Sequence, residues 1–302
     1  MERNVFLDYF KIFISIFIVC SHMHPLFGYE NFGGWCISNG IGRLAVPLFF
    51  IINGFYTYSK LTDYQAVKKY IKHLTLIYLV WTLIYSPFFI TSVRVKDIVA
   101  IILTGYYHLW YMPAAIIAII LLYFVKKYIK NDYYILLLGL ILYIAGFILS
   151  HYANKIFYYR NGITIGFIFV AIGYFIKSKQ LEKQFKDIHL ILIICITIIA
   201  LTIESYHRFV TTQGNPFQDF LFFILILSPS LFIFVIKHPK YISDKGFINI
   251  VPSGIYFLHP IAMAIVGMPD QYRIYRLLPV LFVSVIFSYI VYLINKRVKI
   301  FF

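Results

Sequence analysis

The amino-acid sequence predicts an all-α protein, a polytopic bundle of about ten transmembrane helices with both termini in the cytoplasm. Of its 302 residues, 61% are hydrophobic and 13% are charged, and the mean hydropathy is +0.82. A soluble core of this size could not bury so much apolar surface. Apolar runs of about a bilayer's thickness recur along the chain, and basic residues gather in alternate connections between them.

The apolar runs that can span a bilayer are each roughly a bilayer thickness long or slightly shorter. A further run at 98–105 is too short to span, and we expect a re-entrant or interfacial segment there. No soluble domain of useful size interrupts the runs, so we expect one integral-membrane domain over residues 1–302. The predicted spans lie near residues 5–24, 41–59, 72–92, 108–125, 133–151, 161–177, 188–206, 217–236, 252–267 and 276–295.

The net charge of +15 would suggest nucleic acid as the partner of a soluble protein. Here the basic residues alternate from loop to loop, which indicates a membrane topology instead, and we expect no nucleic-acid partner. Placing the N-terminus inside makes the lysine-rich connections cytoplasmic, and the positive-inside rule then predicts an even number of spans. These connections lie at 60–72, 126–130, 177–186, 237–245 and 296–299.

The first apolar run is long and lacks a small-residue cleavage site after it, so we expect a retained span and no cleavable signal peptide. Cys20, Cys36 and Cys195 have no metal-ligand spacing, and no metal site is expected. A disulfide between Cys20 and Cys36 is compatible with the sequence, but no pattern supports it.

The first span carries a lysine and a histidine eleven residues apart, Lys11 and His22. At about 100° per residue they return to within about 20° of one direction, so they share a helix face, roughly 16 Å apart along the axis. Asp8 and Ser15 fall on the same stripe. Ionisable groups inside a bilayer are costly and usually functional. Lys11 is equally compatible with an ion pair to Asp8, and His22 alone with an ordinary hydrogen-bonded histidine.

Polar and aromatic residues at several span ends collect on the predicted outer side, which indicates a polar cavity open to the exterior. Arg43 lies between glycines and Pro47, which predicts an irregular helix facing protein, although contact with lipid phosphate is an alternative. Trp110 and Tyr111 are also typical of an aromatic belt. The other members of this outer group are His22, His24, His108, Arg160, Asn161 and Glu204.

A second polar group is expected deeper in the membrane. Asn53 lies past the middle of the second span, and Tyr256 and His259 share a face of the ninth. His259 is expected roughly 10 Å from the cytoplasmic end of its helix. Pro260 leaves a backbone carbonyl that neighbouring groups must satisfy, so a kinked helix with a hydrogen-bonded core histidine explains this pattern as well as a functional role does.

These residues together resemble the acyltransferase-3 family of bacterial membrane acyltransferases, many of which O-acetylate surface polysaccharides. Asp8, Lys11 and His22 look like its first-helix signature, a basic residue, ten others and then histidine. The resemblance covers the chain from about residue 5 to 296, and its motifs occur in the same order. The later landmarks are similar to Arg43 with residues 46–50 and 53–55, residues 108–113, residues 160–162 with Gly173, Glu204, and residues 256–260.

The chain departs from the family pattern at two positions. Lys11 stands where the family usually has arginine, which keeps the charge but loses the bidentate fork that binds phosphate. Asn53 stands where the family usually has serine, so no role as a nucleophile can be carried to it. The chain ends soon after the last span, so we expect no fused esterase-like domain, and a partner supplying that step would be a separate protein.

The resemblance implies that acetyl-coenzyme A (acetyl-CoA) enters from the cytoplasm as acyl donor, without a permanently bound cofactor. The acetyl group would reach a hydroxyl of an extracytoplasmic or lipid-linked glycan (O-antigen, capsule or exopolysaccharide) at the bacterial plasma membrane. His22 is implied as general base or acyl carrier, and Arg43 as its catalytic partner. The implied coenzyme-binding residues are Lys11, Asn53, Tyr256 and His259, and those that position the acceptor are Tyr111, Trp110, Arg160, Asn161 and Glu204.

Two functions from other classes also suit a polar cavity inside about ten spans. One is a transporter or flippase for a polyprenyl-linked glycan, although transporters commonly show internal repeats, and the polar features of the first five spans have no clear counterparts in the last five. The other is a membrane sensor or binding protein for a small amino acid. Consumption of acetyl-CoA separates an acyltransferase from both.

Overall fold

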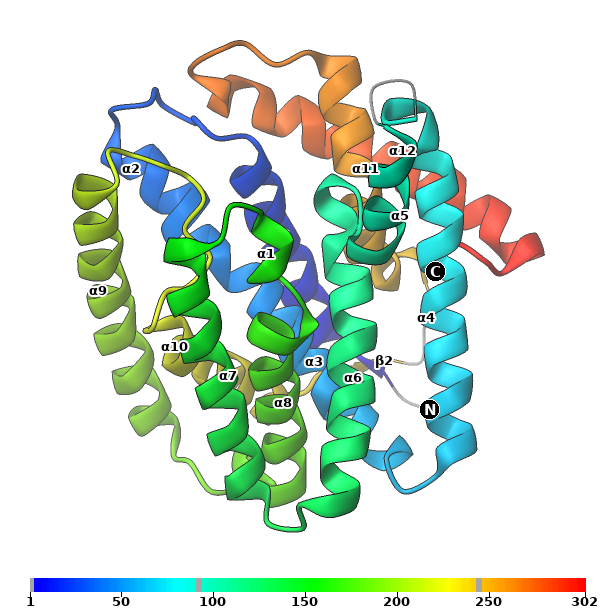
Figure 1. Ribbon diagram of the computed structural model, residues 1–302, viewed down its shortest axis with the longest axis vertical. Helices are drawn as coiled ribbons and strands as arrows, with labels where there is room; N and C mark the ends of the chain where they lie inside the picture. The colour runs from blue at the N-terminus through cyan, green and yellow to red at the C-terminus, as the bar shows by residue number, and fades with distance from the viewer. Residues whose placement is uncertain (1–2, 91–93, 243–245) are drawn as a thin grey trace. The chain divides into compact units, whose positions relative to one another are not determined.

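The computed structural model describes residues 3–90, 94–242 and 246–302, and helices make up most of them (Figure 1). The described part contains one departure from the all-α prediction, a two-residue antiparallel ladder. In it β1 (Arg3–Asn4) pairs with β2 (Tyr241–Ile242), Arg3 opposite Ile242 and Asn4 opposite Tyr241. The predicted end of the third span, near residue 92, lies outside the described residues.

The chain packs as two compact units, and one domain over 1–302 stays a prediction. The first unit comprises Met1–Phe49 and Leu181–Val298, and the second comprises Phe50–Gln180 and Lys299–Phe302. Helix α3 (Ala45–Thr57) begins in the first and continues into the second.

The first unit is built around α1 (Val5–His22), which packs against α11 (Val251–Val266). Ser15 Oγ lies 3.4 Å from the carbonyl oxygen of Pro252, so a buried hydroxyl links the two helices. In turn α11 packs closely on α12 (Leu277–Val298), because a Cβ on Gly254 would lie 2.1 Å from the hydroxyl of Ser288. The other helical elements of the first unit are α2 (Phe32–Trp35), η1 (Cys36–Gly40), η2 (Ile41–Leu44), η8 (Leu181–Lys183), α9 (Asp187–Thr211), α10 (Ile224–Lys237), η9 (Phe247–Asn249) and η10 (Arg273–Arg276).

In the second unit, α6 (Tyr111–Tyr128), α7 (Asp132–Tyr152) and α8 (Phe167–Lys179) lie side by side (Figure 1). Two glycines let α3 approach α8 closely. A Cβ on Gly54 would lie 2.0 Å from the carbonyl oxygen of Val170, and a Cβ on Gly173 would lie 2.0 Å from that of Ile51. The other elements of the second unit are η3 (Tyr58–Lys60), α4 (Tyr64–Tyr85), η4 (Ser86–Phe88), α5 (Val95–Thr104), η5 (Tyr107–Trp110), η6 (Ile156–Tyr158) and η7 (Gly162–Gly166).

Seven described helical segments are long and apolar enough to cross a membrane. Two shorter apolar helices, α10 and α11, occupy the predicted eighth and ninth spans. Residues 72–85 of the predicted third span lie in α4, a 22-residue helix that begins earlier than predicted, at Tyr64, and carries several lysines in its first half. The count of about ten spans and the orientation of the termini stay predictions. The seven segments are 5–22, 32–60, 107–128, 132–152, 162–179, 187–211 and 273–298.

Several predicted boundaries were wrong. The second span, expected from residue 41, belongs to a helical segment that begins at Phe32 and includes a π-helical turn, η1, and a 3-10 turn, η2. The seventh, expected to end at 206, continues to Thr211. The eighth, expected from 217, becomes α-helical only at Ile224, because contacts from Arg43 and Glu204 hold the preceding chain in a loop.

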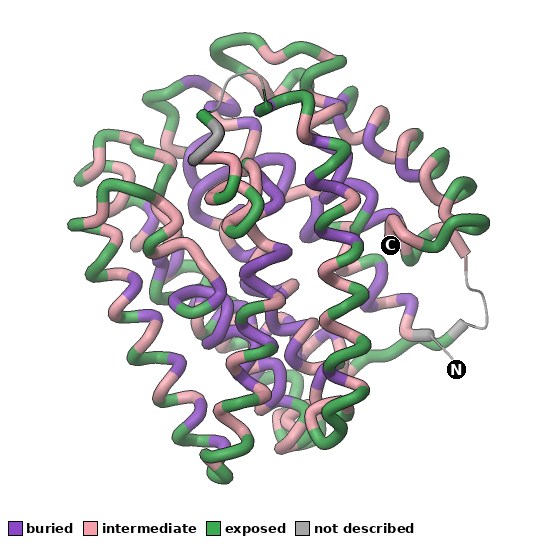
Figure 2. The backbone as a smooth tube through the Cα atoms, turned by 45° about the vertical axis from the view of Figure 1, so that its right-hand side comes forward, coloured by how far each residue is buried: buried purple, intermediate pink, exposed green. Residues whose placement is uncertain are grey.

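Burial differs strongly between these segments, and buried and exposed positions alternate along most helices (Figure 2). Segments 32–60 and 162–179 are mostly buried, whereas only about a fifth of α7, α9 and α12 is buried. The exposed side chains of these three helices are largely apolar, including Leu137, Ile196 and Phe282. Such surfaces suit contact with lipid tails and would be unfavourable in water.

Candidate functional site

The lysine and the histidine of the first span lie on one uninterrupted helix. Asn4 caps its first turn, since its side-chain oxygen accepts the N–H of Leu7 at 3.2 Å. Lys11 Nζ lies 3.2 Å from Oδ1 of Asp8, which is buried. The ion pair that the sequence left open for Lys11 is therefore present, and contact of Lys11 with a coenzyme stays a prediction.

At the other end of α1, His22 meets His259 of α11. Nδ1 of His22 lies 3.3 Å from Nε2 of His259, and the ring centroids are 4.9 Å apart. Nδ1 of His22 also lies 2.9 Å from the carbonyl oxygen of Ile18. His259 is fully buried, whereas His22 is partly exposed. The prediction that His259 belongs to a group separate from His22 was wrong, because the last turn of α1 meets the middle of α11.

His259 is held by the carbonyl groups of its own helix. Its Nδ1 lies 2.9 Å from the oxygen of Tyr256 and 3.0 Å from that of Ile255. Pro260 has no N–H to offer the Tyr256 carbonyl, and the imidazole takes that place. The hydrogen-bonded histidine expected from the sequence is present. The phenol ring of Tyr256 packs on Phe257 at 4.8 Å between centroids, and a role of Tyr256 in binding the coenzyme stays a prediction.

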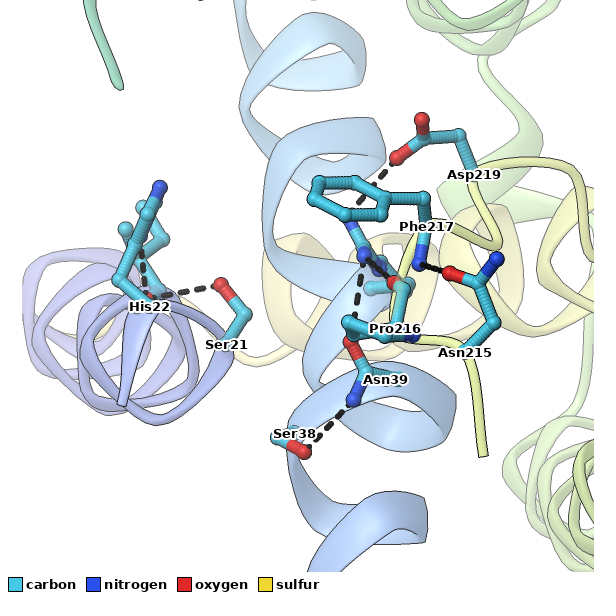
Figure 3. Close-up of polar contacts among 10 residues, drawn as sticks. Ser21, His22, Ser38, Asn39, Asn215, Pro216, Phe217 and Asp219 are labelled. Atoms are coloured by element: carbon cyan, nitrogen blue, oxygen red, sulfur yellow. Dashed lines mark hydrogen bonds and ion pairs between the residues drawn. The ribbon is translucent and has the colours of Figure 1, made fainter. Parts of the chain in front are cut away.

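Arg43, in η2, is part of a polar network in the first unit, whose members Asn39, Pro216 and Asp219 are labelled in Figure 3. Its Nη1 lies 2.8 Å from Oδ1 of Asp219, and its Nη2 donates to Oδ1 of Asn39 at 3.2 Å and to the carbonyl of Pro216. The irregular, protein-facing helix expected around Arg43 is confirmed. Asp219 and Asn39 were missed, because Asp219 lies in a loop 176 residues away and neither residue belongs to a recognisable spacing.

His24 lies in the loop that follows α1, beside the same network. Its Nδ1 lies 3.2 Å from Nδ2 of Asn39 and 3.2 Å from Oγ of Ser38. Arg273 Nη1 donates to the backbone carbonyl of His24 at 2.7 Å. Burial lowers the pKa of the His24 imidazole below its usual value, and the positive charges of Arg273 and Arg43 lower this pKa further.

In the second unit, Asn53 and Tyr111 form a hydrogen bond. Asn53 Nδ2 donates to the Tyr111 hydroxyl at 2.7 Å, and the hydroxyl of Tyr70 lies 3.4 Å from Asn53 Oδ1. The sequence analysis assigned Asn53 to the coenzyme and Tyr111 to the acceptor, and the structure brings the two together. Tyr70 of α4 was missed, because the chain contains 27 tyrosines and no spacing distinguishes this one.

Trp110 and Arg160 also lie together in this unit. The Arg160 guanidinium is 5.5 Å from the centre of the Trp110 ring, a cation–π contact. Asn161, next in the chain, caps η7, since its Oδ1 accepts the N–H groups of Ile163 at 2.8 Å and Thr164 at 3.1 Å. Contact of Trp110, Arg160 and Asn161 with an acceptor stays a prediction.

Glu204 of α9 caps the beginning of α10. Its two carboxylate oxygens accept the backbone N–H groups of Phe222 at 2.8 Å and Phe223 at 3.1 Å. A negative charge at a helix N-terminus is stabilising, so these contacts fix where α10 begins. The sequence did not predict this capping role, and contact of Glu204 with an acceptor stays a prediction.

The three cysteines form no disulfide bond. Cys20 and Cys36 are buried free thiols, without the disulfide that the sequence left open. Within the described ranges, no group of three or more His, Cys, Asp or Glu residues is placed to hold a metal ion.

Apolar helices long enough to span a membrane, with a histidine pair and an arginine network in one unit, define a polytopic membrane protein with a polar site. The acyltransferase-3 family model, described as an acyltransferase domain, matches residues 4–293. The chain therefore belongs to this family of acyltransferases.

Curated relatives match only along part of their own length. An amino-acid racemase of Enterococcus faecalis is 32% identical over 74% of this chain and 34% of its own length, and a second one from this species is 26% identical over 88% of this chain and 42% of its own. A serine/alanine racemase of Enterococcus gallinarum is 28% identical over 87% of this chain and 41% of its own. The chain thus spans less than half the length of these relatives. No solved structure matches it.

Proposed function

We propose that this protein transfers an acetyl group from cytoplasmic acetyl-CoA to a hydroxyl of an extracytoplasmic glycan in the bacterial plasma membrane. Membership of the acyltransferase family supports acyl transfer. The observation that carries the proposal is His22, a partly exposed imidazole at the end of a membrane-type helix, held by His259 and by the Ile18 carbonyl. Imidazole titrates near neutral pH and is the commonest general base in proteins.

In the proposed reaction, His22 removes the proton from the acceptor hydroxyl as its oxygen attacks the thioester carbonyl carbon. A carbon–oxygen bond forms, and the carbon–sulfur bond then breaks. The coenzyme leaves as a thiolate, which takes the proton back from the imidazolium. This sequence needs no oxidant, reductant or metal, and it regenerates neutral His22. A positive charge near the carbonyl oxygen would stabilise the tetrahedral intermediate, and we assign this role to Arg43.

We assign Lys11 to the donor, at the end of α1 opposite His22. The two residues lie roughly 16 Å apart by helical rise, a span that the extended pantetheine arm of the coenzyme can bridge. The Lys11 ammonium pairs with the Asp8 carboxylate in the structure. A coenzyme phosphate bound at Lys11 would therefore share the positive charge of Lys11 with Asp8. Lys11→Gln is expected to raise the KM for acetyl-CoA more than it lowers kcat, whereas the exposed Lys155→Gln serves as a control.

The proposal is tested with the purified protein in lipid nanodiscs. Release of coenzyme A from acetyl-CoA and transfer of labelled acetyl to a polyprenyl-linked oligosaccharide are measured for the wild type and His22→Gln. His151→Gln is a matched control, because His151 makes the same contact with the carbonyl four residues earlier, Phe147, at 2.9 Å. We expect His22→Gln to lose more than about 100-fold of the transfer rate. Equal rates for the His22 and His151 variants would contradict the assignment.

The names of the relatives favour a second candidate function, binding of a small amino acid. The matched proteins are called amino-acid racemases and a serine/alanine racemase, and this chain corresponds to part of them. Binding of labelled serine and alanine to the purified protein, together with a failure to consume acetyl-CoA, would favour this candidate. Consumption of acetyl-CoA without retention of either amino acid would favour acyl transfer.

A further inference from the structure

The imidazole of His259 has both of its nitrogens engaged, and the partners of one nitrogen determine where its proton lies. Nδ1 faces two backbone carbonyl oxygens, those of Tyr256 at 2.9 Å and Ile255 at 3.0 Å. A carbonyl oxygen accepts hydrogen bonds and cannot donate them. Nδ1 must therefore carry the proton, and Nε2 of neutral His259 carries the lone pair.

Pro260 is the reason that a carbonyl is available for this bond. In a regular α-helix the N–H of residue 260 would bond to the carbonyl of residue 256. Proline has no N–H, so the Tyr256 carbonyl would otherwise be left unsatisfied in a buried position. His259 is fully buried and supplies the missing donor. The order histidine then proline thus selects one tautomer of the buried imidazole.

The same reasoning applies to His22. Its Nδ1 lies 2.9 Å from the carbonyl oxygen of Ile18 and 3.3 Å from Nε2 of His259. Both of these atoms are acceptors once the proton of His259 is on Nδ1. Nδ1 of His22 must donate, and its proton is shared between the two acceptors. The lone pair of neutral His22 is consequently on Nε2, the other nitrogen of the ring.

We propose that His259 is a positioning residue that holds His22 in the tautomer with its lone pair on Nε2, so that Nε2 is the base of the acyl transfer. Contact of His259 with the coenzyme, expected from the family resemblance, stays a prediction. The proposal rests on the proposed function for the catalytic step, but the tautomer itself is a property of the resting protein. When His22 takes a proton from the acceptor, the new N–H forms at Nε2, and Nδ1–H remains bonded to His259 and Ile18.

In this arrangement His259 orients the catalytic base His22 through a hydrogen bond to its second ring nitrogen. A general base works only when its lone pair faces the proton to be removed, and a partner on the other ring nitrogen fixes that orientation. At metal sites, partners on the second nitrogen of a histidine are worth about 10- to 100-fold in activity. We expect an effect of the same size here, expressed in kcat more than in KM.

The first test reads the tautomer directly, without any substrate. The protein is labelled with nitrogen-15 in its histidine rings and placed in nanodiscs, and His22 is assigned by comparison with His22→Gln. We expect the nitrogen-15 shifts of neutral His22 to show a protonated Nδ1 and an unprotonated Nε2. The opposite pattern in the wild type would overturn the proposal, whatever the activity of the protein.

The second test removes the acceptor. His259→Phe keeps the ring shape without a nitrogen, and His259→Gln offers a side-chain oxygen that can accept the His22 proton. We expect His259→Phe to change the ring signals of His22 but not those of His151, and to lower kcat about 10- to 100-fold. His259→Gln should restore most of the wild-type ring signals of His22 and most of the wild-type kcat. Unchanged His22 signals in His259→Phe would overturn the positioning role.

These measurements separate this proposal from the proposed function. A protein that consumes no acetyl-CoA yet shows the expected His22 tautomer would refute the acyl transfer and leave the histidine arrangement standing. A protein whose His259→Phe variant transfers acetyl groups as fast as the wild type would refute the positioning role and leave the reaction standing.

Discussion

At the scale of single residues, the arginine network of the first unit depends on the charge of Asp219. The Arg43 side chain is 19% exposed and that of Asp219 is 5% exposed, so the pair is shielded from water. Removing one partner of a buried ion pair costs about 3–5 kcal/mol, because the other charge is left uncompensated. Asp219→Asn should therefore lower the thermal midpoint in detergent by several times more than Asp97→Asn, whose partner Arg94 is 74% exposed. Similar shifts for the two variants would contradict a structural role for the Arg43–Asp219 pair.

The second prediction at this scale concerns pH. Burial and two neighbouring arginines lower the pKa of His24 in the folded protein, whereas an unfolded histidine has a pKa of about 6.5. The unfolded chain then binds a proton more readily, so the contribution of His24 to stability is complete above about pH 6.5 and is lost as the pH falls below it. We expect the wild type to lose more thermal stability between pH 7.5 and 5 than His24→Asn does. Parallel pH profiles for the two proteins would contradict this.

Contacts within one helix could be predicted from the sequence, whereas contacts between distant segments could not. The shared face of Lys11 and His22 follows from helical geometry alone, and so does the unsatisfied carbonyl ahead of Pro260. The contact between His22 and His259 could not be predicted, because it depends on how two helices 237 residues apart cross each other. The partners of Arg43 were missed for the same reason, since Asp219 and Pro216 belong to a loop with no motif.

At the scale of helices, close packing of α3 on α8 depends on two glycines. A methyl group on Gly173 would lie 2.0 Å from the Ile51 carbonyl oxygen, so Gly173→Ala must push the helices apart. Overpacking of this kind costs about 1–3 kcal/mol. Gly33→Ala is a milder comparison, because its new methyl group would lie 3.2 Å from the Asn31 side-chain oxygen. We expect a clear fall in thermal midpoint for Gly173→Ala and a smaller one for Gly33→Ala, measured in the same detergent. Equal falls for the two variants would contradict this account of the α3–α8 contact.

A second prediction at the helix scale concerns Pro260, which lies inside α11. Pro260→Ala supplies an N–H that competes with the His259 ring for the Tyr256 carbonyl. We expect this variant to keep or gain thermal stability and to lose acyl transfer several-fold, because the His259 tautomer is then less strongly selected. Pro252→Ala is the control, since Pro252 lies at the first turn of α11, where a helix lacks an acceptor for the N–H. A Pro260→Ala protein with full activity would contradict the link between Pro260 and the histidine pair.

Helix boundaries illustrate the limit of hydropathy as a guide. The apolar runs located most helices, because twenty or so apolar residues have few alternatives in a membrane. They misplaced the start of α10, because Phe217 and residues 220–223 are apolar and extend the run, although Gln218 and Asp219 interrupt it. The loop is held by a carboxylate from another helix, Glu204, which accepts the N–H groups of Phe222 and Phe223 just before α10 begins at Ile224. Such caps come from tertiary contacts, which hydropathy does not contain.

At the scale of the whole molecule, the remaining prediction is the orientation in the membrane. Helix α7 has 21 residues, roughly 31 Å by helical rise, which matches the hydrocarbon thickness of a bilayer. Its two ends should therefore face opposite sides, and the excess of lysine before it predicts that its N-terminal end is cytoplasmic.

Cysteine labelling tests this orientation. The cysteine of Lys130→Cys, in the turn before α7, should react with a membrane-impermeant maleimide only after the membrane is opened. A cysteine at Asn154, after α7, should react in intact cells. The three native cysteines are first replaced by serine, since Cys195 is exposed. The reverse pattern of labelling would contradict the predicted orientation of α7 in the membrane.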